Sequence, residues 1–372
     1  MRSEELYKPE IKKIEVDGFS LNCARHGEVV QLCQKGFLTS YDNSDIGMMR
    51  NAVRLFCPDE GQLNSLLVVL RNGEARVYKK FPMSVLIRSK VEIKQFHAVF
   101  KNQILDVEGV EFKDSIFQLD VKDGDKFLWL FRNGFSFGLY FDFSGKLKVD
   151  QLVAELGNCY RSLEYYSEIN FWEQADNSTR LLSLGWFPFV QLIGHGLEHL
   201  QAANDEDLVR MRETLVAAFN KERIEGFSKY WWSNPIFQKK RNIINAGLNS
   251  FYRGEPDDII NCIKNLLSEI EGIVRIGYFQ ELGKDPTTRE LKDYLVSKAQ
   301  TRFSTDGSLG FPGLFSSYLN DVIFKGFNLK DEVDLSRHSV SHGVAPTEVY
   351  TKERALQCIL TLDQMYFYLG KN

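Results

Sequence analysis

Three polar residues near the end of the chain have the types and spacing of a metal-free RNA-cleaving site. The segment Leu335–Gly343 (LSRHSVSHG) contains Arg337, His338 and His342. A neutral imidazole, with a reference pKa of about 6.5, can remove the proton from a ribose 2′-hydroxyl near neutral pH. A guanidinium can donate paired hydrogen bonds to phosphate oxygens as negative charge develops on them. We therefore expect His342 to act as the base, Arg337 to contact the phosphate and His338 to support them.

The expected reaction is an in-line attack of the 2′-oxygen on the neighbouring phosphorus, which yields a 2′,3′-cyclic phosphate and a 5′-hydroxyl. It calls for no metal and no cofactor. On a helix, His338 and His342 share a face, whereas Arg337 lies well round the helix and has to reach back. Gly343 is expected to end the turn, so that the helix dipole favours a protonated His342. Because an Arg and a His five residues apart also occur by chance, the alternative is a solvated basic turn.

Residues 1–145 are predicted to form an antiparallel β-rich domain, folded as a sandwich or a barrel. Two hairpin turns are the strongest signals, because Asn-Gly supplies the two positive-φ residues that a tight turn requires. Asn72-Gly73 separates Ser65–Leu70 from Glu74–Lys79, and Asn133-Gly134 separates Lys126–Phe131 from Phe135–Phe143. Further short strands are expected at Phe19–Ala24, Val29–Cys33, Ala52–Cys57, Met83–Arg88 and Ser115–Val121.

Helical periodicity replaces the strand pattern in the rest of the chain. Residues 146–204 are predicted to be a helical connector, with a helix at Val149–Trp172, a loop at Asp176–Thr179 and an aromatic segment at Gly185–Phe189. Residues 205–372 are predicted to form an all-α bundle. Its helices are expected at Asp207–Lys221, Asn234–Arg253, Asp257–Leu282, Thr287–Phe303, Pro312–Lys325 and Thr351–Leu369, with Thr351 as an N-cap and Gly283 and Gly326 as C-caps. The chain is thus predicted to be a two-domain α+β protein.

The segment around Arg337 resembles the R-x4-H signature of HEPN domains, in which a polar residue usually follows the arginine. The stretches Arg241–Leu248, Tyr252–Asp258, Leu266–Gly272 and Ala355–Leu369 are also similar, so the resemblance covers roughly residues 185–372. It implies a helical bundle that pairs through its last helices, with two R-x4-H segments facing one cleft. It also implies an endoribonuclease that acts in defence against phage, as a toxin or in RNA processing.

The same resemblance implies a buried glutamate beside the site. Glu269 or Glu271 would orient Arg337 or His342, although one of the two is as well explained as a solvated helix face. A homodimer is expected, because the implied cleft needs two motifs and because Tyr366–Tyr368 suggests an exposed aromatic face on the last helix.

Two other patterns suggest sites of different kinds. His195, Glu198 and His199 match the H-x-x-E-H pattern of zinc peptidases, in which two histidines on one helical face bind the metal. Gly194 and Gly196 weaken the helix that this zinc hydrolase would need, so interfacial histidines are the preferred interpretation. Lys239, Lys240 and Arg241 follow Trp231-Trp232, which is either an RNA-guiding surface or core packing beside a solvated basic turn.

Composition restricts the remaining function classes. With 46 basic and 50 acidic residues the net charge is −4, so any contact with RNA must be local. Scattered cysteines and a charged N-terminal stretch without an apolar core predict a cytoplasmic protein, and no membrane span is expected. The N-terminal domain is expected to sense a trigger by binding a regulatory ligand or protein. The main alternative to a nuclease is a catalytically inactive module that dimerises and binds RNA, a nucleotide or a protein.

Overall fold

The computed structural model of the 372-residue chain divides into two compact units. One contains residues 1–88 and 107–166, and the other contains residues 89–106 and 167–372. Side chains are described for residues 84–111, 157–201, 206–303 and 308–370, apart from residues 96, 159, 162, 163, 166 and 195. Seven strands outside these ranges are described by their backbones.

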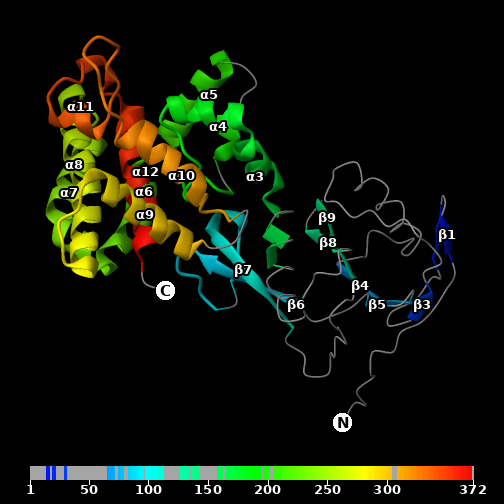
Figure 1. Cartoon of the computed structure of the whole chain (residues 1–372). Helices are drawn as coiled ribbons and strands as arrows, with labels where there is room; N and C mark the ends of the chain where they lie inside the picture. The colour runs from blue at the N-terminus through cyan, green and yellow to red at the C-terminus, as the bar shows by residue number, and fades with distance from the viewer. Residues whose placement is uncertain are drawn as a thin grey trace. The chain divides into compact units, whose positions relative to one another are not determined.

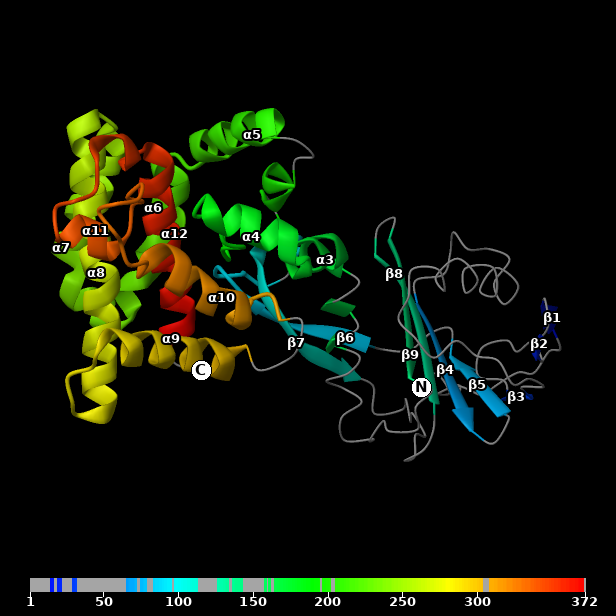
Figure 2. The same cartoon turned by 45° about the horizontal axis from the view of Figure 1, so that its top comes forward.

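The strands of the first unit pair antiparallel, as its turn signals predict. One sheet has five strands in the order β3-β5-β4-β8-β9 (Figure 2), and each neighbouring pair is antiparallel. These strands are β3 (Val29–Gln31), β4 (Ser65–Arg71), β5 (Glu74–Tyr78), β8 (Lys126–Asn133) and β9 (Ser136–Asp142). A separate pair is formed by β1 (Ile14–Val16) and β2 (Phe19–Leu21).

The registers test the two predicted hairpins separately. Arg71 pairs with Glu74, so Asn72-Gly73 connects the first two strands as predicted. Asn133 pairs with Ser136, so the second pair of strands is joined by residues 134 and 135, one residue later than predicted. A glycine at the first position of a two-residue connection is the sequence pattern of a type II′ turn.

An antiparallel β-rich part followed by a helical part therefore describes the fold class correctly. A sandwich or barrel would require these sheets to close or to pack face to face, and that arrangement stays a prediction. The strands expected at Ala52–Cys57 and Ser115–Val121 lie outside the described residues.

The helical unit includes a segment that the sequence assigned to the β-rich domain. β6 (Met83–Ser89) and β7 (Ile104–Phe112) form their own two-stranded sheet, and residues 89–106 belong to the helical unit. Lys90 is only 6% exposed, and its Nζ donates a hydrogen bond to the carbonyl oxygen of Ile193 at 2.8 Å. Residues 167–204 belong to the same unit, so the predicted connector and bundle are largely one body.

Capping residues set the ends of the main helices of this unit (Figure 1). Thr351 accepts a hydrogen bond from the backbone of Arg354 at the last helix, and Gly283 is left-handed with φ 71°, both as predicted. In chain order the helices are α3 (Tyr166–Glu173), α4 (Ala175–Ser183), α5 (Asp205–Ala218), α6 (Lys221–Ser228), α7 (Pro235–Arg253), α8 (Pro256–Leu282), α9 (Thr288–Arg302), α10 (Pro312–Tyr318), α11 (Arg337–Ser341) and α12 (Lys352–Leu369).

Three sequence predictions about these helices are wrong. The loop expected at Asp176–Thr179 is part of α4, because Asp and Asn are tolerated in a helix once its apolar face is buried. The helix expected at Asp207–Lys221 ends at Ala218, where Asn220 caps a new helix by accepting from the backbone of Arg223 at 2.9 Å. The helix expected at Pro312–Lys325 continues after α10 as a π-helical turn, Leu319–Ile323. It ends there, so Gly326 is not its C-cap.

Helix α12 forms the centre of the unit rather than an outer face. Both views place it between α7 and α8 on one side and α4 and α5 on the other (Figures 1 and 2). Tyr368 is 2% and Phe367 is 8% exposed, so the exposed aromatic face predicted for dimerisation does not exist. A helix that is buried on most sides is apolar on most sides, so its hydrophobic periodicity cannot distinguish it from a helix at a subunit interface. The aromatic face expected to mediate the dimer is therefore part of the core, and the homodimer itself stays a prediction.

The aromatic segment that precedes α5 is also part of this core. Trp186, Phe187 and Phe189 are fully buried, and the ring of Phe187 packs edge-on against that of Phe315 in α10 at 5.3 Å. The aromatic segment expected at Gly185–Phe189 is therefore part of the hydrophobic core. Among the described helices, none combines the length and the apolar character needed to cross a membrane.

Candidate functional site

The R-x4-H segment forms a short helix with a well-defined start and end. Ser336 caps α11: its hydroxyl accepts from the backbone N–H of Ser339, and the Ser339 hydroxyl accepts from the Ser336 N–H at 2.9 Å. The Ser339 hydroxyl is fully buried and also donates to the Asp334 carbonyl at 2.7 Å. At the other end His342 is the C-cap, followed by Gly343 with φ 69°. The predicted end of the helix at Gly343 is confirmed. Arg337 is the first residue of α11 and His342 is its C-cap, so the two ends of the motif lie at the two ends of this helix.

A buried carboxylate holds Arg337 in place. Glu271, in the middle of α8, is 7% exposed and its Oε2 forms an ion pair with Nε of Arg337. Its other oxygen, Oε1, accepts from Nη2 of Arg275 at 2.9 Å. Arg275 in turn contacts Asp285 through Nη1 at 2.5 Å. The two guanidiniums and two carboxylates form a chain that orients Arg337 and leaves its outer nitrogens available.

Of the two glutamates considered, the structure assigns one to the motif and one elsewhere. Glu271 contacts Arg337, whereas Glu269 pairs with Lys240 of α7 at 3.0 Å. Both carboxylates are buried, at 7% and 6% exposure. The interpretation of one as a solvated helix face is wrong, because α8 is covered by α7 on one side and by α11 and α12 elsewhere.

His338 lies among the charged groups of the site. Its pKa is lowered, first by partial burial and then by the positive charge of Arg337, while Glu271 opposes the shift. His342 and Lys292 lower the same pKa further. His338 is therefore held uncharged near neutral pH and can accept or donate a hydrogen bond there.

His342 is the exposed member of the motif. It is the C-cap residue of α11, and its side chain is exposed to solvent. Its ring lies 5.6 Å from the ring of Phe327, and the ring of His338 lies 6.5 Å from that of Phe324. An exposed imidazole beside a fixed guanidinium can take a proton from a ligand while the guanidinium binds its anionic group.

Sequence reasoning missed three residues that contribute to this site. Arg275 shares the carboxylate of Glu271, and its i,i+4 spacing on α8 was the only available signal. Lys292 of α9 is half-buried, donates to Oδ1 of Asn320 and acts electrostatically on His338. Phe327 comes from the loop before α11, and nothing in the sequence indicated that it lies beside His342.

The basic cluster on α7 is not part of the same arrangement. Lys240 is engaged with Glu269, and the guanidinium of Arg241 lies over the ring of Trp232 at 5.3 Å. Lys239 is exposed. Trp231 is fully buried, so this region combines core packing with an exposed basic surface of α7 and no basic turn, and a role of Lys239, Lys240 and Arg241 in RNA binding stays a prediction.

Of the residues proposed to bind zinc, Glu198 and His199 are described, and they do not lie on an α-helix. Gly194 and Gly196 have φ values of 77° and 128°, and the segment Leu197–Leu200 that contains His199 is a 3-10 turn. Glu198 uses its Oε2 to accept from the N–H of Gly196 at 2.8 Å. The segment that carries His199 therefore does not supply the α-helical face that a zinc peptidase needs, and zinc binding by His195 and His199 stays a prediction. The side chain of His195 lies outside the described residues.

Comparisons with family models, curated proteins and solved structures yield no match to this chain. Its function is therefore inferred from the geometry of its own residues.

Proposed function

We propose that the chain is a metal-independent endoribonuclease with Arg337 and His342 as its catalytic pair. The ion pair between Arg337 and the buried Glu271 carries this proposal, because it fixes a guanidinium on the short helix that also carries His338 and ends at the exposed His342. That combination fits a reaction in which a proton leaves a ribose hydroxyl while charge builds on a phosphate. The helical unit would then be HEPN-like, and the protein a defence or toxin effector.

In the proposed reaction His342 accepts the proton of the 2′-hydroxyl. The 2′-oxygen attacks the adjacent phosphorus, the bond from phosphorus to the 5′-oxygen breaks, and the leaving oxygen takes up a proton. Arg337 donates hydrogen bonds from its outer nitrogens to the phosphate oxygens, while Nε stays on Glu271. His338, which is held uncharged, accepts or donates one hydrogen bond to the same phosphate or ribose. The products are a 2′,3′-cyclic phosphate and a 5′-hydroxyl.

Two further parts of the proposal concern the assembly. A second copy would bring a second R-x4-H segment to the cleft, and because α12 is buried the copies would meet through other surfaces of the helical unit. The molar mass in solution tests this part, and a monomer that cleaves RNA would contradict it. The N-terminal β-rich domain, as a sandwich or barrel, would receive the trigger.

RNA cleavage in the presence of EDTA tests the catalytic pair. Wild type should cleave, whereas Arg337→Ala and His342→Ala should each lose most of the activity. Arg289→Ala is the matched control, because Arg289 is an exposed arginine paired only loosely with Asp293, at 3.7 Å. Cleavage that persists when Arg337 and His342 are both replaced would contradict the proposal.

A second candidate is a non-catalytic module that binds RNA or a nucleotide. The observation in its favour is again the Glu271 ion pair, because a guanidinium whose charge is partly offset can hold a phosphate without promoting its cleavage. Binding of RNA without cleavage by wild type, and loss of that binding in Arg337→Ala, would favour this candidate over the nuclease.

A further inference from the structure

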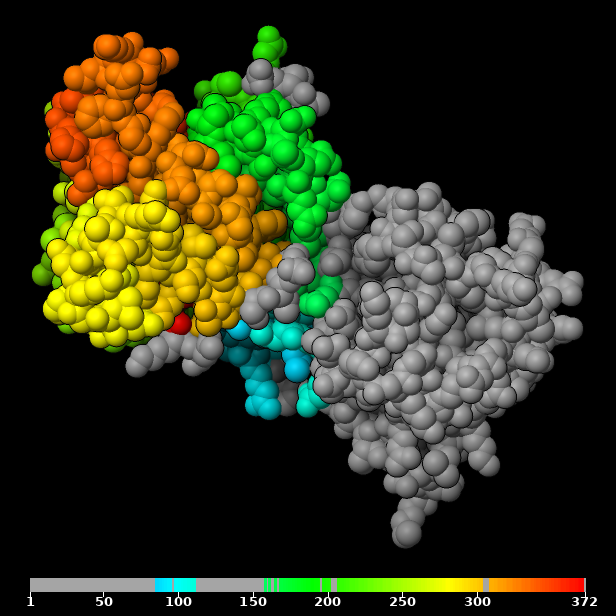
Figure 3. All heavy atoms as spheres, in the orientation of Figure 1, coloured from blue at the N-terminus to red at the C-terminus, as the bar shows by residue number. Residues whose placement is uncertain are grey.

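The loop that precedes the R-x4-H helix is an ordered structure. We call residues 324–334 the aromatic loop. An ion pair between Lys325 and Asp334 closes its base. Its tip is a turn in which the N–H of Asp331 donates to the carbonyl of Asn328 at 3.0 Å and the Asn328 amide donates to the Asp331 carboxylate at 2.9 Å. Figure 3 shows this orange segment at the surface, at one end of the helical unit.

Two phenylalanines of the aromatic loop contact the two histidines of the motif. The ring of Phe324 lies 6.5 Å from His338, and the ring of Phe327 lies 5.6 Å from His342. They differ in burial: Phe324 is 5% exposed and belongs to the core, whereas Phe327 is only half-buried. Phe327 therefore leaves part of an aromatic face next to the exposed imidazole.

We propose that Phe327 binds a nucleobase by stacking, and that this base belongs to the nucleotide whose 2′-hydroxyl faces His342. The proposal rests on the proposed function for its substrate class. The base and the 2′-hydroxyl are carried by the same ribose, on adjacent carbons. A group that lies beside the general base is therefore also beside the nucleobase, and a flat apolar ring is the surface on which an unstacked base packs.

The surroundings of Phe327 favour a base over a phosphate as its ligand. Leu329 at the tip of the same loop is 71% exposed, so the loop presents apolar surface at two positions. Of the two lysines of the loop, Lys325 is engaged by Asp334, whereas Lys330 is exposed near the tip. The phosphate contacts remain with Arg337 on α11. The site is thus divided into an anion-binding part on the helix and a base-binding part on the loop.

Base stacking makes a prediction that a purely positioning role for Phe327 does not. We suggest measuring binding, by fluorescence anisotropy in EDTA, to a short 2′-fluoro oligoribonucleotide, which lacks the attacking hydroxyl and stays intact. The same backbone without bases is the second probe. Wild type should bind the base-containing probe about tenfold or more tightly than the abasic one. Phe327→Ala should lose this preference, and Phe327→Tyr should keep it.

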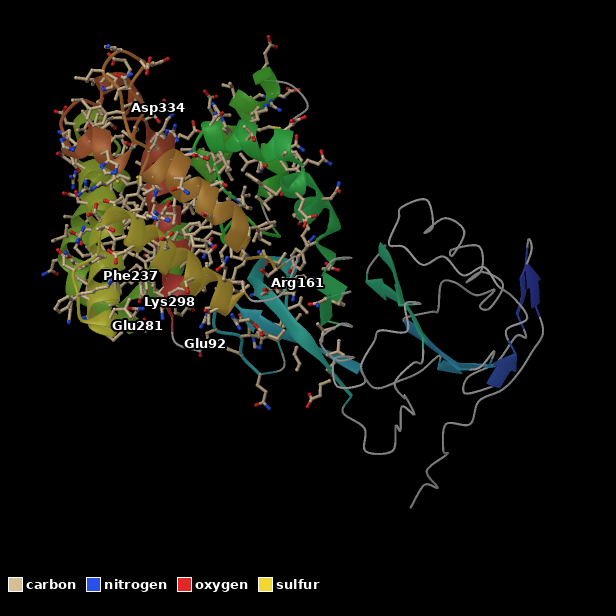
Figure 4. All side chains as sticks on the ribbon, viewed as in Figure 1. Glu92, Arg161, Phe237, Glu281, Lys298 and Asp334 are labelled. Carbon is tan, nitrogen blue, oxygen red and sulfur yellow. The ribbon has the colours of Figure 1, made fainter. Side chains whose placement is uncertain are left out.

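Phe279→Ala is the matched control, because Phe279 is an exposed phenylalanine of the same unit, at 56% exposure. It lies two residues from Glu281, and Figure 4 places Glu281 and Asp334 at opposite ends of the unit. The control should bind like wild type. An equal affinity of wild type for both probes, or a base preference that survives in Phe327→Ala, would overturn the stacking proposal.

The outcome is independent of whether the chain cleaves RNA. Base-dependent binding through Phe327 without any cleavage of natural RNA would support the stacking site and refute the nuclease. Cleavage that depends on Arg337 and His342 but not on Phe327 would support the nuclease and refute the stacking site. No binding of either probe at any concentration tested would refute the stacking site.

Discussion

Replacing Glu271 by glutamine should separate the positioning of Arg337 from the stability of the helix that carries Glu271. The substitution keeps the shape of the side chain and removes its charge. It leaves Arg337 without its ion pair, while Arg275 retains Asp285 at 2.5 Å. Arg337 would then be free to leave the orientation in which its outer nitrogens face the site.

The magnitude follows from the exposure of the three side chains. A hydrogen bond to a charged group contributes about 1.5–3 kcal/mol when it is buried. The Glu271 side chain is 9% exposed, but those of Arg337 and Arg275 are 28% and 35% exposed, so solvent screens part of each interaction. We expect the free energy of unfolding to fall by about 2–3 kcal/mol. Misplacement of a guanidinium by about 1 Å is expected to lower cleavage about a hundredfold.

Glu269→Gln is the control, since Glu269 lies on the same helix, is equally buried and pairs with Lys240 at 3.0 Å. Denaturant unfolding should give similar stability losses for both variants, whereas RNA cleavage should fall only in Glu271→Gln. In a double variant with Arg337→Ala, the Glu271 substitution should cause no additional loss of cleavage. Equal losses of cleavage in Glu269→Gln and Glu271→Gln would refute the reasoning, because the effect would then reflect α8 as a whole.

Three further predictions concern stability and the short helix. Burial lowers the pKa of Lys90 from 10.5 to about 7, so between these two pH values the unfolded chain binds more protons than the folded chain. The free energy of unfolding should therefore rise with pH in this range, by up to about 1.4 kcal/mol per pH unit. Urea unfolding should show that Lys90→Met lacks this rise. Ser336→Ala removes the N-cap of α11, so the free energy of unfolding measured in urea should fall by about 1 kcal/mol and RNA cleavage should also decrease. An unchanged stability would mean that this cap does not stabilise the folded protein. Gly226 lies in the interior of α6, and a Cβ added there would meet no side chain or distant backbone within 4 Å, so Gly226→Ala should stabilise the protein by about 0.5–1 kcal/mol. Gly343 has a φ of 69°, so Gly343→Ala should destabilise it by about 1 kcal/mol. Changes of the opposite sign in thermal unfolding would contradict these two expectations.

Local sequence signals predicted helix ends and one hairpin well where a cap or a turn requires a particular residue type. Thr351 begins α12 and Gly283 ends α8 through contacts within a few residues, and such contacts are visible in a sequence. The same holds for the Asn72-Gly73 hairpin. The burial of α12 was not predictable in this way, because it depends on helices that are far away in the chain.

The candidate site was predicted in part for the same reason. The motif itself is contiguous, so Arg337, His338 and His342 were found together, and the resemblance also pointed to Glu271. Which of Glu269 and Glu271 faces the motif was undecidable from spacing, since it depends on how α8 is rotated against α7 and α11. Phe327 was missed because the aromatic loop folds back on the motif through contacts that no periodicity encodes.

The proposed attack of the 2′-oxygen is tested most directly by removing that oxygen from one nucleotide. The cleavage position of a short RNA is mapped first, and the oligonucleotide is then resynthesised with a single 2′-deoxyribose on the 5′ side of the cleaved bond. In EDTA, we expect wild type to cut the RNA with a 2′,3′-cyclic phosphate at the new end and to leave the substituted bond intact. Cleavage of the substituted bond, or a plain 3′-phosphate formed without a cyclic intermediate, would contradict the assignment of His342 as the base that activates this hydroxyl.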